Sequence, residues 1–447
     1  VAISLFKGLC ENGFVKNKVL EFAGPGVASL PTDFRNGIDV MTTETTCLSS
    51  IWITDEKVEE YYKMHERPEA YKELKPGEVA YYDSMIRIDL SEQESMIALP
   101  FHPSNAYTIH ELQADPEGIL KKVEEDAKNR FGDKISIDLE SKIKNGKAYA
   151  DQAIIAGCSG GTYDNLSEAA SIMKGKTIGN DYFTMSAYPQ STPVYLATTR
   201  NHIAEELLEA GVVIKPAFCG PCFGAGDVPA NNGLSIRHTT RNFPNREGSK
   251  PGQGQISLVC LMDARSIAAT AANGGVITAA TDVQYEDTHK PYSFDDRIYK
   301  SRIYNGFGKA DPTVELRYGP NIKDWPKMYQ MEENMLLELA AVIHDPVTTT
   351  DELIPSGETS SYRSNPLKLS EFALSRRVPE YVGLSKRIQS EDLDRRAGKT
   401  PQHVLDALAK VGANADNTSF GSCVFANKPG DGSAREQAAS CQKVLGG

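Results

Sequence analysis

The sequence predicts an α/β fold in which parallel sheets are built from βαβ units. Gln152–Ala156 has the apolar composition of a buried strand, and it runs through a glycine-rich turn at 157–161 into a helix expected from about Asp164. The same alternation follows as strand, helix and strand at 192–199, 202–210 and 212–215. Strands that alternate with helices are typical of parallel sheets whose faces are covered by those helices.

The first block of the chain, residues 1–130, mixes strand and helix signals. Val15–Phe22 leads directly into the turn Gly24-Pro25-Gly26, so we expect a strand that stops at that turn. Asp55–Lys75 places apolar residues among charged ones at helical spacing, which predicts an amphipathic helix.

A segment rich in Tyr, Asp, Lys and Gly, with little periodicity, separates the last block from the rest. In the last block a helix is expected at Pro401–Val411, with Thr400 as N-cap, Pro401 in its first position and Gly412 just past its end. Four segments are therefore expected: an α/β domain at 1–130, a second α/β domain at 131–281, a linker at 282–326 and a partial C-terminal domain at 327–447.

Composition excludes several classes of protein. The 447 residues include 48 Lys and Arg against 60 Asp and Glu, a net charge of −12, and this acidic balance argues against a nucleic-acid partner. The best apolar run, 266–281, is too short and too rich in Thr, Ala and Gly to span a membrane. Because the sequence carries no secretory signal, we expect a cytoplasmic protein with reduced cysteines. The start at Val1 and the stop at Gly447 predict that both ends are edges of a longer protein.

Three of the eight cysteines stand apart from the others. Cys219-Gly-Pro-Cys222 fits a thioredoxin-like redox motif, a zinc site or part of an iron–sulfur site. The glycines of Phe223–Gly226 disfavour the helix that the redox motif needs, and a zinc site would need a further ligand pair. Cys158 lies on its own glycine turn and can join the pair at one edge of a parallel sheet. The remaining five are expected to be small buried hydrophobes: Cys10, Cys47, Cys260, Cys423 and Cys441.

Seven stretches resemble signature segments of the aconitase family of iron–sulfur hydro-lyases, in the family's order: 17–27, 41–44, 156–163, 219–224, 241–246, 349–351 and 430–436. The resemblance runs nearly end to end and is closest to a bacterial branch of aconitase-like hydratases. It implies parallel-sheet domains of the aconitase iron–sulfur type, followed by part of a C-terminal swivel-type α/β domain.

The resemblance also implies roles for ten residues. The ligands of a [4Fe–4S] cluster, whose fourth iron stays open as a Lewis acid, would be Cys158, Cys219 and Cys222. The substrate carboxylates would be bound by Arg241, Arg246, Arg363 and Arg435, since guanidinium pairs with carboxylate bidentately. Ser433 would take the proton from the carbon next to a carboxylate, and Asp351 and Glu44 would orient groups or handle protons.

Ser433 has a second interpretation, because Ser433-Ala-Arg-Glu436 fits a capping box with Ser433 as N-cap and Glu436 at N3. Some positions also depart from the family pattern, and these changes argue against citrate specificity: Val40, Ser159, Gly160, Thr240 and Ala434. The family's Asp-His pair and Asp-Ser-His segment do not occur in this sequence. The acid for the leaving group is therefore expected from an N-terminal domain that the sequence lacks.

The expected function is that of a [4Fe–4S]-dependent hydro-lyase acting on a small hydroxy di- or tricarboxylic acid. Two alternatives remain at this point: a cluster-free aconitase-like protein that binds RNA, and a thiol-redox protein built on the CGPC motif. The net charge of −12 disfavours the first. Without the leaving-group acid, we do not expect the chain alone to turn over substrate.

Overall fold

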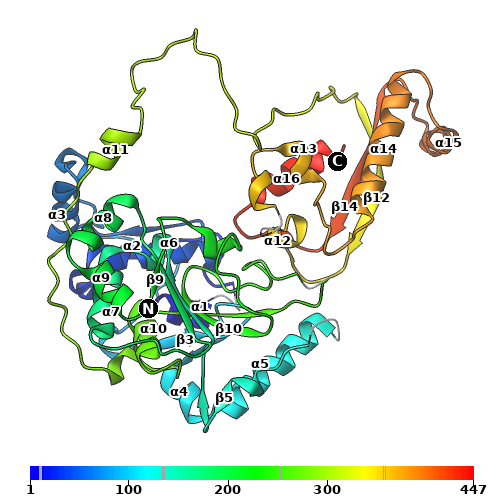
Figure 1. Cartoon of the computed structure of the whole chain (residues 1–447). Coiled ribbons are helices and arrows are strands. Elements are labelled where there is room, and N and C mark those ends of the chain that lie inside the picture. Colours follow the sequence, from blue (N-terminus) through cyan, green and yellow to red (C-terminus); the bar gives the residue numbers. More distant parts are fainter. Residues whose placement is uncertain (10–12, 133–135, 251–252, 356, 358) are drawn as a thin grey trace. The chain divides into compact units, whose positions relative to one another are not determined.

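The computed structural model describes residues 1–9, 13–132, 136–250, 253–355, 357 and 359–447, so Cys10 lies outside the described residues. The chain forms two compact units, unit 1 (Val1–Lys309) and unit 2 (Ala310–Gly447) (Figure 1). The division falls inside the segment 282–326 that the sequence predicts as a linker. Within the described part of the chain, no helix has both the length and the apolar character of a membrane span.

Unit 1 is built on a seven-stranded sheet. Across the sheet the strands are β4 (Ala106–Thr108), β3 (Met96–Ala98), β11 (Ser257–Met262), β10 (Gly233–His238), β7 (Gln152–Ala156), β8 (Thr184–Tyr188) and β9 (Val213–Ile214). Strands β7 to β11 pair in parallel, whereas β3 and β4 form an antiparallel edge. Because β3 and β4 precede residue 130, the expected segments 1–130 and 131–281 share this sheet.

Helices cover the sheet and bury its strands. The principal ones are α4 (Ile109–Ala114), α5 (Pro116–Phe131), α7 (Tyr163–Met173), α8 (Thr192–Arg200), α9 (Ile203–Glu209) and α10 (Ala264–Ala272). Every residue of β11 is buried, and Ile155 and Ile236 are fully inaccessible. Near-continuous apolar strands of this kind belong to parallel sheets covered on both faces.

The segment 192–199 is a helix and not the predicted strand. Its β-branched residues favour a strand, but Ser191 caps a helix by accepting a hydrogen bond from the amide of Val194, and Pro193 occupies the first turn. Proline and a serine cap both favour a helix start, and here they outweigh side-chain propensity. The strand of this region is β8, which lies just upstream. The helix and strand expected at 202–210 and 212–215 are confirmed as α9 and β9.

The N-terminal part of unit 1 contains shorter elements: α1 (Ala2–Leu9), β1 (Val19–Phe22), η1 (Pro25–Ser29), α2 (Thr32–Thr42), η2 (Thr43–Thr45), β2 (Ser49–Trp52), α3 (Glu56–Met64), η3 (Pro68–Ala70) and η4 (Leu90–Glu92). Strands β1 and β2 pair in parallel. The expected strand at Val15–Phe22 is confirmed only over β1, and the helix predicted from Asp55 ends at Met64. Farther along lie η6 (Glu140–Lys142), β5 (Ile143–Lys144), β6 (Lys147–Ala148), η9 (Ala280–Asp282) and α11 (Arg297–Arg302).

The first half of the expected linker is part of unit 1. The Tyr163 hydroxyl donates a 2.6 Å hydrogen bond to the carbonyl oxygen of Lys290. His289 Nε2 lies 2.9 Å from a carboxylate oxygen of Glu206. These contacts attach the segment to α7 and α9. It is therefore packed on the domain, although its sequence has little periodicity.

Unit 2 is centred on two parallel strands, β12 (Asn334–Ile343) and β14 (Thr418–Ala426), against which α14 (Tyr381–Arg396) packs. Its other elements are β13 (Thr348–Thr349), α12 (Thr350–Leu353), η10 (Ser360–Tyr362), α13 (Pro366–Ser370), α15 (Gln402–Val411), β15 (Pro429–Asp431) and α16 (Arg435–Val444). Helix α15 confirms the expected helix, although Pro401 and not Thr400 is its N-cap, and Gly412 ends it in a left-handed conformation at φ 72°.

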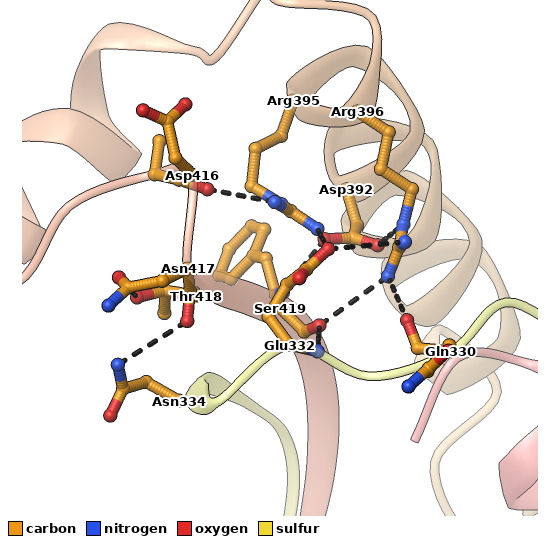
Figure 2. A network of polar contacts seen from close by, with 12 residues as sticks. Gln330, Glu332, Asn334, Asp392, Arg395, Arg396, Asp416, Asn417, Thr418 and Ser419 are labelled. Carbon is orange, nitrogen blue, oxygen red and sulfur yellow. Dashed lines mark hydrogen bonds and ion pairs between the residues drawn. The ribbon is translucent and has the colours of Figure 1, made fainter.

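The end of α14 joins the start of both long strands (Figure 2). Arg395 and Arg396 each donate a 2.7 Å hydrogen bond from Nε to Asp392. Asp392 also accepts the amide of Phe420 at 2.9 Å, and the Arg396 guanidinium reaches the carbonyl oxygen of Gln330 at 3.1 Å. Burial opposes ionisation of Asp392, but these donors lower its pKa below the ordinary value of 3.8.

Replacing Asp392 with Asn should destabilise unit 2 by about 1–3 kcal/mol at pH 7, because charge-assisted hydrogen bonds to both arginines are lost. Since the folded-state pKa lies below the unfolded one, this stabilisation is present above the unfolded pKa and disappears as pH falls through the folded pKa. The difference from wild type should therefore vanish in strong acid. Denaturant titrations followed by Trp325 fluorescence in a Trp52→Phe background measure it. Asp394→Asn, an exposed change on the same helix, is the control; an equal effect of both would contradict the assignment.

Candidate functional site

The predicted site residues form two groups, one in each unit. Unit 1 contains what we call the cysteine half-site: Glu44, Cys158, Cys219, Cys222, Arg241 and Arg246. Unit 2 contains the serine half-site: Asp351, Arg363, Ser433 and Arg435. Each half-site is assembled from segments that are far apart in the sequence.

Cys158 lies on a tight turn between β7 and α7. One helical turn, α6 (Gly157–Gly160), presents the exposed cysteine directly after the strand. A Cβ atom on Gly160 would lie 2.2 Å from the carbonyl oxygen of His238, and one on Gly161 would lie 2.1 Å from that of Tyr188. The turn is thus wedged between the carboxyl ends of β10 and β8, where only glycine fits.

Cys222 lies on the 3₁₀ turn η7 (Gly220–Phe223), and Cys219, five residues beyond the end of β9, is the N-cap residue of that turn. Gly224 ends the turn with φ 76°, and a Cβ there would lie 2.6 Å from the amide nitrogen of Gly248. Arg246 Nε donates a 3.0 Å hydrogen bond to the carbonyl oxygen of Cys222. The CGPC segment is therefore held in place by contacts with the loop that carries Arg241 and Arg246. It does not begin a long helix.

Arg237 also belongs to this site, although no sequence motif pointed to it. Its guanidinium is almost fully buried and donates to four acceptors: Ser235 Oγ (2.8 Å), the Pro221 carbonyl (2.8 Å), Gln152 Oε1 (3.2 Å) and the Asp227 carbonyl (3.0 Å). Two of these acceptors lie on β10 and β7, one is Pro221 within the CGPC turn, and one is Asp227, five residues after it. Arg237 thereby fixes the turn to β10 and to β7, the strand that Cys158 follows.

The two cysteine turns lie next to each other. A Cβ atom added to Gly157 would lie 3.7 Å from Cys222 Sγ. The hydrogen bond from the Cys222 thiol lowers the pKa of Cys219 to about 6, with help from the positive charges of Arg241 and Arg246. The same hydrogen bond, together with burial, raises the pKa of Cys222. Burial, and then the charge of Cys219, raises the pKa of Cys158. The site therefore favours a thiolate that neighbouring cations stabilise.

The donor set fits an iron–sulfur cluster better than a single zinc ion. Zinc holds thiolates at about 2.3 Å, which puts tetrahedral ligands roughly 3.8 Å apart. In the described part of the chain, the sulfurs of Cys158, Cys219 and Cys222 are not all within 4.8 Å of one another. A four-iron cluster is larger, so its thiolates are spaced more widely, and three exposed or half-exposed cysteines beside arginines suit it.

Glu44 joins the cysteine half-site through an ion pair. It lies on η2, and its carboxylate accepts a hydrogen bond from Arg241 Nε across 197 residues of sequence. The Glu44 side chain is 5% exposed and that of Arg241 is 16% exposed. The positive charge of Arg241 also favours the thiolate forms of Cys158 and Cys219. Glu44 therefore orients a cation that stabilises these thiolates.

The serine half-site forms where two paired strands end. Strands β13 and β15 pair in parallel with Thr349 opposite Asp431. Asp351 follows β13 on α12, and Ser433 follows β15. A Cβ on Gly432 would lie 2.2 Å from Thr350 Oγ1, so the two turns are in contact.

Arg363 and Arg435 complete the serine half-site from two directions. Arg363 Nη1 donates a 3.1 Å hydrogen bond to Gln437 Oε1 on α16. Gln437 lies two residues beyond Arg435, which begins that helix. All four predicted residues of unit 2 are therefore grouped around the first turn of α16 and the start of α12.

The capping box predicted at Ser433 is wrong. Helix α16 begins at Arg435 with Ala434 as N-cap, and no side chain caps it. The capping box of this half-site is instead at α12, where Thr349 and Glu352 satisfy each other's backbone amides. Ser433 is exposed and lies two residues ahead of the helix, so its hydroxyl is not committed to capping.

Comparison with known proteins matches residues 1–274 to the model of the aconitase family (aconitate hydratase). Curated relatives include 3-isopropylmalate dehydratase large subunits of Clostridium kluyveri (27% identical over 265 residues) and Rubrobacter xylanophilus (large subunit 2, 29% over 266). Each alignment covers 59% of this chain and 53% of the relative. That of Clostridioides difficile is 28% identical over 270 residues, 60% of this chain and 54% of the relative. The chain thus spans about half the length of the curated relatives it matches.

Arg237→Lys should lower the free energy of unfolding by about 1–3 kcal/mol, because an ammonium cannot reach all four acceptors of the guanidinium. Circular dichroism during denaturation measures this loss. In protein loaded with iron and sulfide, the rate of iron release to a chelator should also rise, because the CGPC turn loses its anchor.

Arg200→Lys is the matched control for that substitution. Arg200 pairs with Asp295 at 2.7 Å on the surface and is 46% exposed, so its replacement should cost less than about 1 kcal/mol. Similar stability and similar iron release in the two variants would show that Arg237 does not position the turn.

Proposed function

The chain belongs to the aconitase family, and we propose that it is part of a [4Fe–4S]-dependent hydro-lyase acting on a small hydroxy di- or tricarboxylic acid. One observation carries the proposal. Cys158, Cys219 and Cys222 come from two adjoining turns that follow parallel strands, beside two arginines that favour thiolate. Three thiolates next to cations suit a cluster with one open iron and an anionic substrate.

The chain's own residues divide the remaining work of such a reaction. When bound, the cluster would supply a Lewis acid for the hydroxyl and carboxylate oxygens of the substrate. Arg241 and Arg246 would hold carboxylates on the cysteine side, and Arg363 and Arg435 on the serine side. Ser433, ahead of α16, would take the proton from the carbon next to a carboxylate, because the helix N-terminus and Arg435 favour its anionic form. Asp351 and Glu44 would orient these groups.

The substrate class follows from the arginines and from the relatives. Each half-site contains two arginines, which suit an acid that carries carboxylates, and the names of the relatives specify 3-isopropylmalate. We infer a hydroxy-dicarboxylate of that kind for the complete protein. The leaving-group acid, any additional domain and a cytoplasmic location stay predictions.

The two alternative functions, thiol exchange and RNA binding, are less well supported. Thiol exchange of the thioredoxin type uses a cysteine at the start of a helix, and η7 is a four-residue turn that stops at Gly224. RNA binding would call for a basic surface, whereas the chain has a net charge of −12.

Anaerobic reconstitution should load about four irons and four sulfides per chain and give broad visible absorbance. Replacing Cys158, Cys219 or Cys222 singly with Ser should abolish stable loading, because each supplies one of three thiolates. Cys423→Ser, a cysteine of unit 2, should load like wild type. A colourless protein that binds zinc, or full loading of the Cys158→Ser variant, would refute the cluster assignment.

The role of Ser433 can be tested without turnover. In D₂O, the cluster-loaded protein should exchange the carbon-bound proton of its hydroxy-acid substrate, a half-reaction that needs the base but not the leaving-group acid. Ser433→Ala should slow exchange by roughly 100-fold or more, as expected for loss of a general base. Proton NMR follows the signal. Ser390→Ala, an exposed serine of α14, should exchange normally, and an unchanged rate in Ser433→Ala would exclude Ser433 as the base.

A further inference from the structure

A short stretch of the expected linker packs beside Arg363 within unit 2. The amide of Lys323 donates a 3.0 Å hydrogen bond to the carbonyl oxygen of Ser364, the residue that follows Arg363. A cavity of about 190 Å³ lies at this contact, and its lining includes Lys323, Trp325, Arg363, Leu369, Gln437 and Cys441. Sequence analysis assigned no role to Lys323 or Trp325.

One side of this cavity is suited to an anion. Lys323 and Arg363 both line it, and none of its described lining residues is acidic. Asp324, between Lys323 and Trp325, instead accepts a 3.1 Å hydrogen bond from the hydroxyl of Tyr318. An ammonium and a guanidinium in one small cavity attract a carboxylate.

The other side of the cavity is apolar. Leu369 and Cys441, which are 3% and 1% exposed, form the buried wall of the cavity. Trp325 is 51% exposed, so its indole can lose water when a ligand binds. A volume near 190 Å³ suits part of a small acid and not a nucleotide or a peptide. The matching ligand carries a carboxylate and a short apolar group.

The cavity adjoins the serine half-site. Gln437, which lines it, accepts the hydrogen bond of Arg363 and lies two residues beyond Arg435 in the first turn of α16. A ligand carboxylate bound by Arg363 would therefore place the apolar part of the same molecule within reach of Trp325.

We propose that Lys323 and Trp325 belong to the substrate subsite of Arg363. Lys323 joins Arg363 in binding a carboxylate, and Trp325 covers an alkyl substituent of the acid. This subsite makes the protein prefer an alkyl-substituted hydroxy-dicarboxylate over an unsubstituted one, and it rests on the proposed function for its substrate. The region taken as a linker is thus a specificity element.

Trp325 itself reports binding, because Trp52 is the second of the two tryptophans and lies in unit 1. The full chain carrying Trp52→Phe is titrated with 3-isopropylmalate and with malate. The alkyl acid should shift the Trp325 emission to shorter wavelength saturably, and malate should bind roughly tenfold more weakly or worse, because it buries no alkyl group. Absence of a saturable shift with 3-isopropylmalate overturns the proposal.

Three variants in the Trp52→Phe background locate the effect. Lys323→Ala should weaken binding roughly two- to fivefold, as for one solvent-screened charge, and Arg363→Ala roughly tenfold or more. Lys327→Ala is the matched control, because this lysine, just past the expected linker, lies over the ring of Tyr329 and does not line the cavity. Equal weakening by Lys323→Ala and Lys327→Ala overturns the assignment of Lys323.

The assay separates this proposal from the proposed function, because it requires neither cluster nor turnover. Selective binding that Lys323→Ala weakens, in a protein that never loads iron, supports the subsite and refutes the hydro-lyase. If the protein loads a cluster and exchanges the substrate proton but shows no preference for 3-isopropylmalate over malate, the hydro-lyase is supported and the subsite is refuted.

Discussion

The buried guanidinium of Arg237 is the constraint on which the cysteine half-site depends. A cation removed from water is tolerated only where its donors are satisfied. Arg237 meets this condition with acceptors on β7, on β10, within the CGPC segment and in the loop after it. The burial that lowers its pKa also makes any displacement of the turn costly, since a shifted turn would leave buried N–H groups of the guanidinium without acceptors. The turn therefore keeps a fixed position on the sheet whether or not a cluster is bound.

Positive charge is concentrated at this edge of the sheet although the chain as a whole is acidic. Arg241 and Arg246 both stabilise the Cys219 thiolate, and each is restrained, one by Glu44 and the other by the carbonyl of Cys222. Local field depends on nearby charges and on burial more than on the net sum. The same arginines can thus favour metal binding by thiolates and attract a carboxylate substrate.

Unit 2 arranges its residues by a different device. Two short parallel strands, β13 and β15, end side by side, and the turns after them carry Asp351 and Ser433. The hydrogen bond between Arg363 and Gln437 ties a loop to the first turn of α16, and Lys323 attaches the linker to that loop. Loop and linker residues therefore contribute as much to this half-site as its helices do.

The sequence by itself determined the local features of this protein. Gln152–Ala156, the turn after it and α7 were predictable because hydrophobicity and glycine act over a few residues, and the cysteines and arginines were identified from short motifs. The helix at 192–200 was also decided locally, because the Ser191 cap and Pro193 outweighed its β-branched residues. Tertiary structure decided the rest. The N-cap of α16 fell at Ala434 and left Ser433 outside the helix. The pairing of Glu44 with Arg241, and the four contacts of Arg237, join residues that no local pattern links, because burial and hydrogen-bond geometry exist only after the strands have packed.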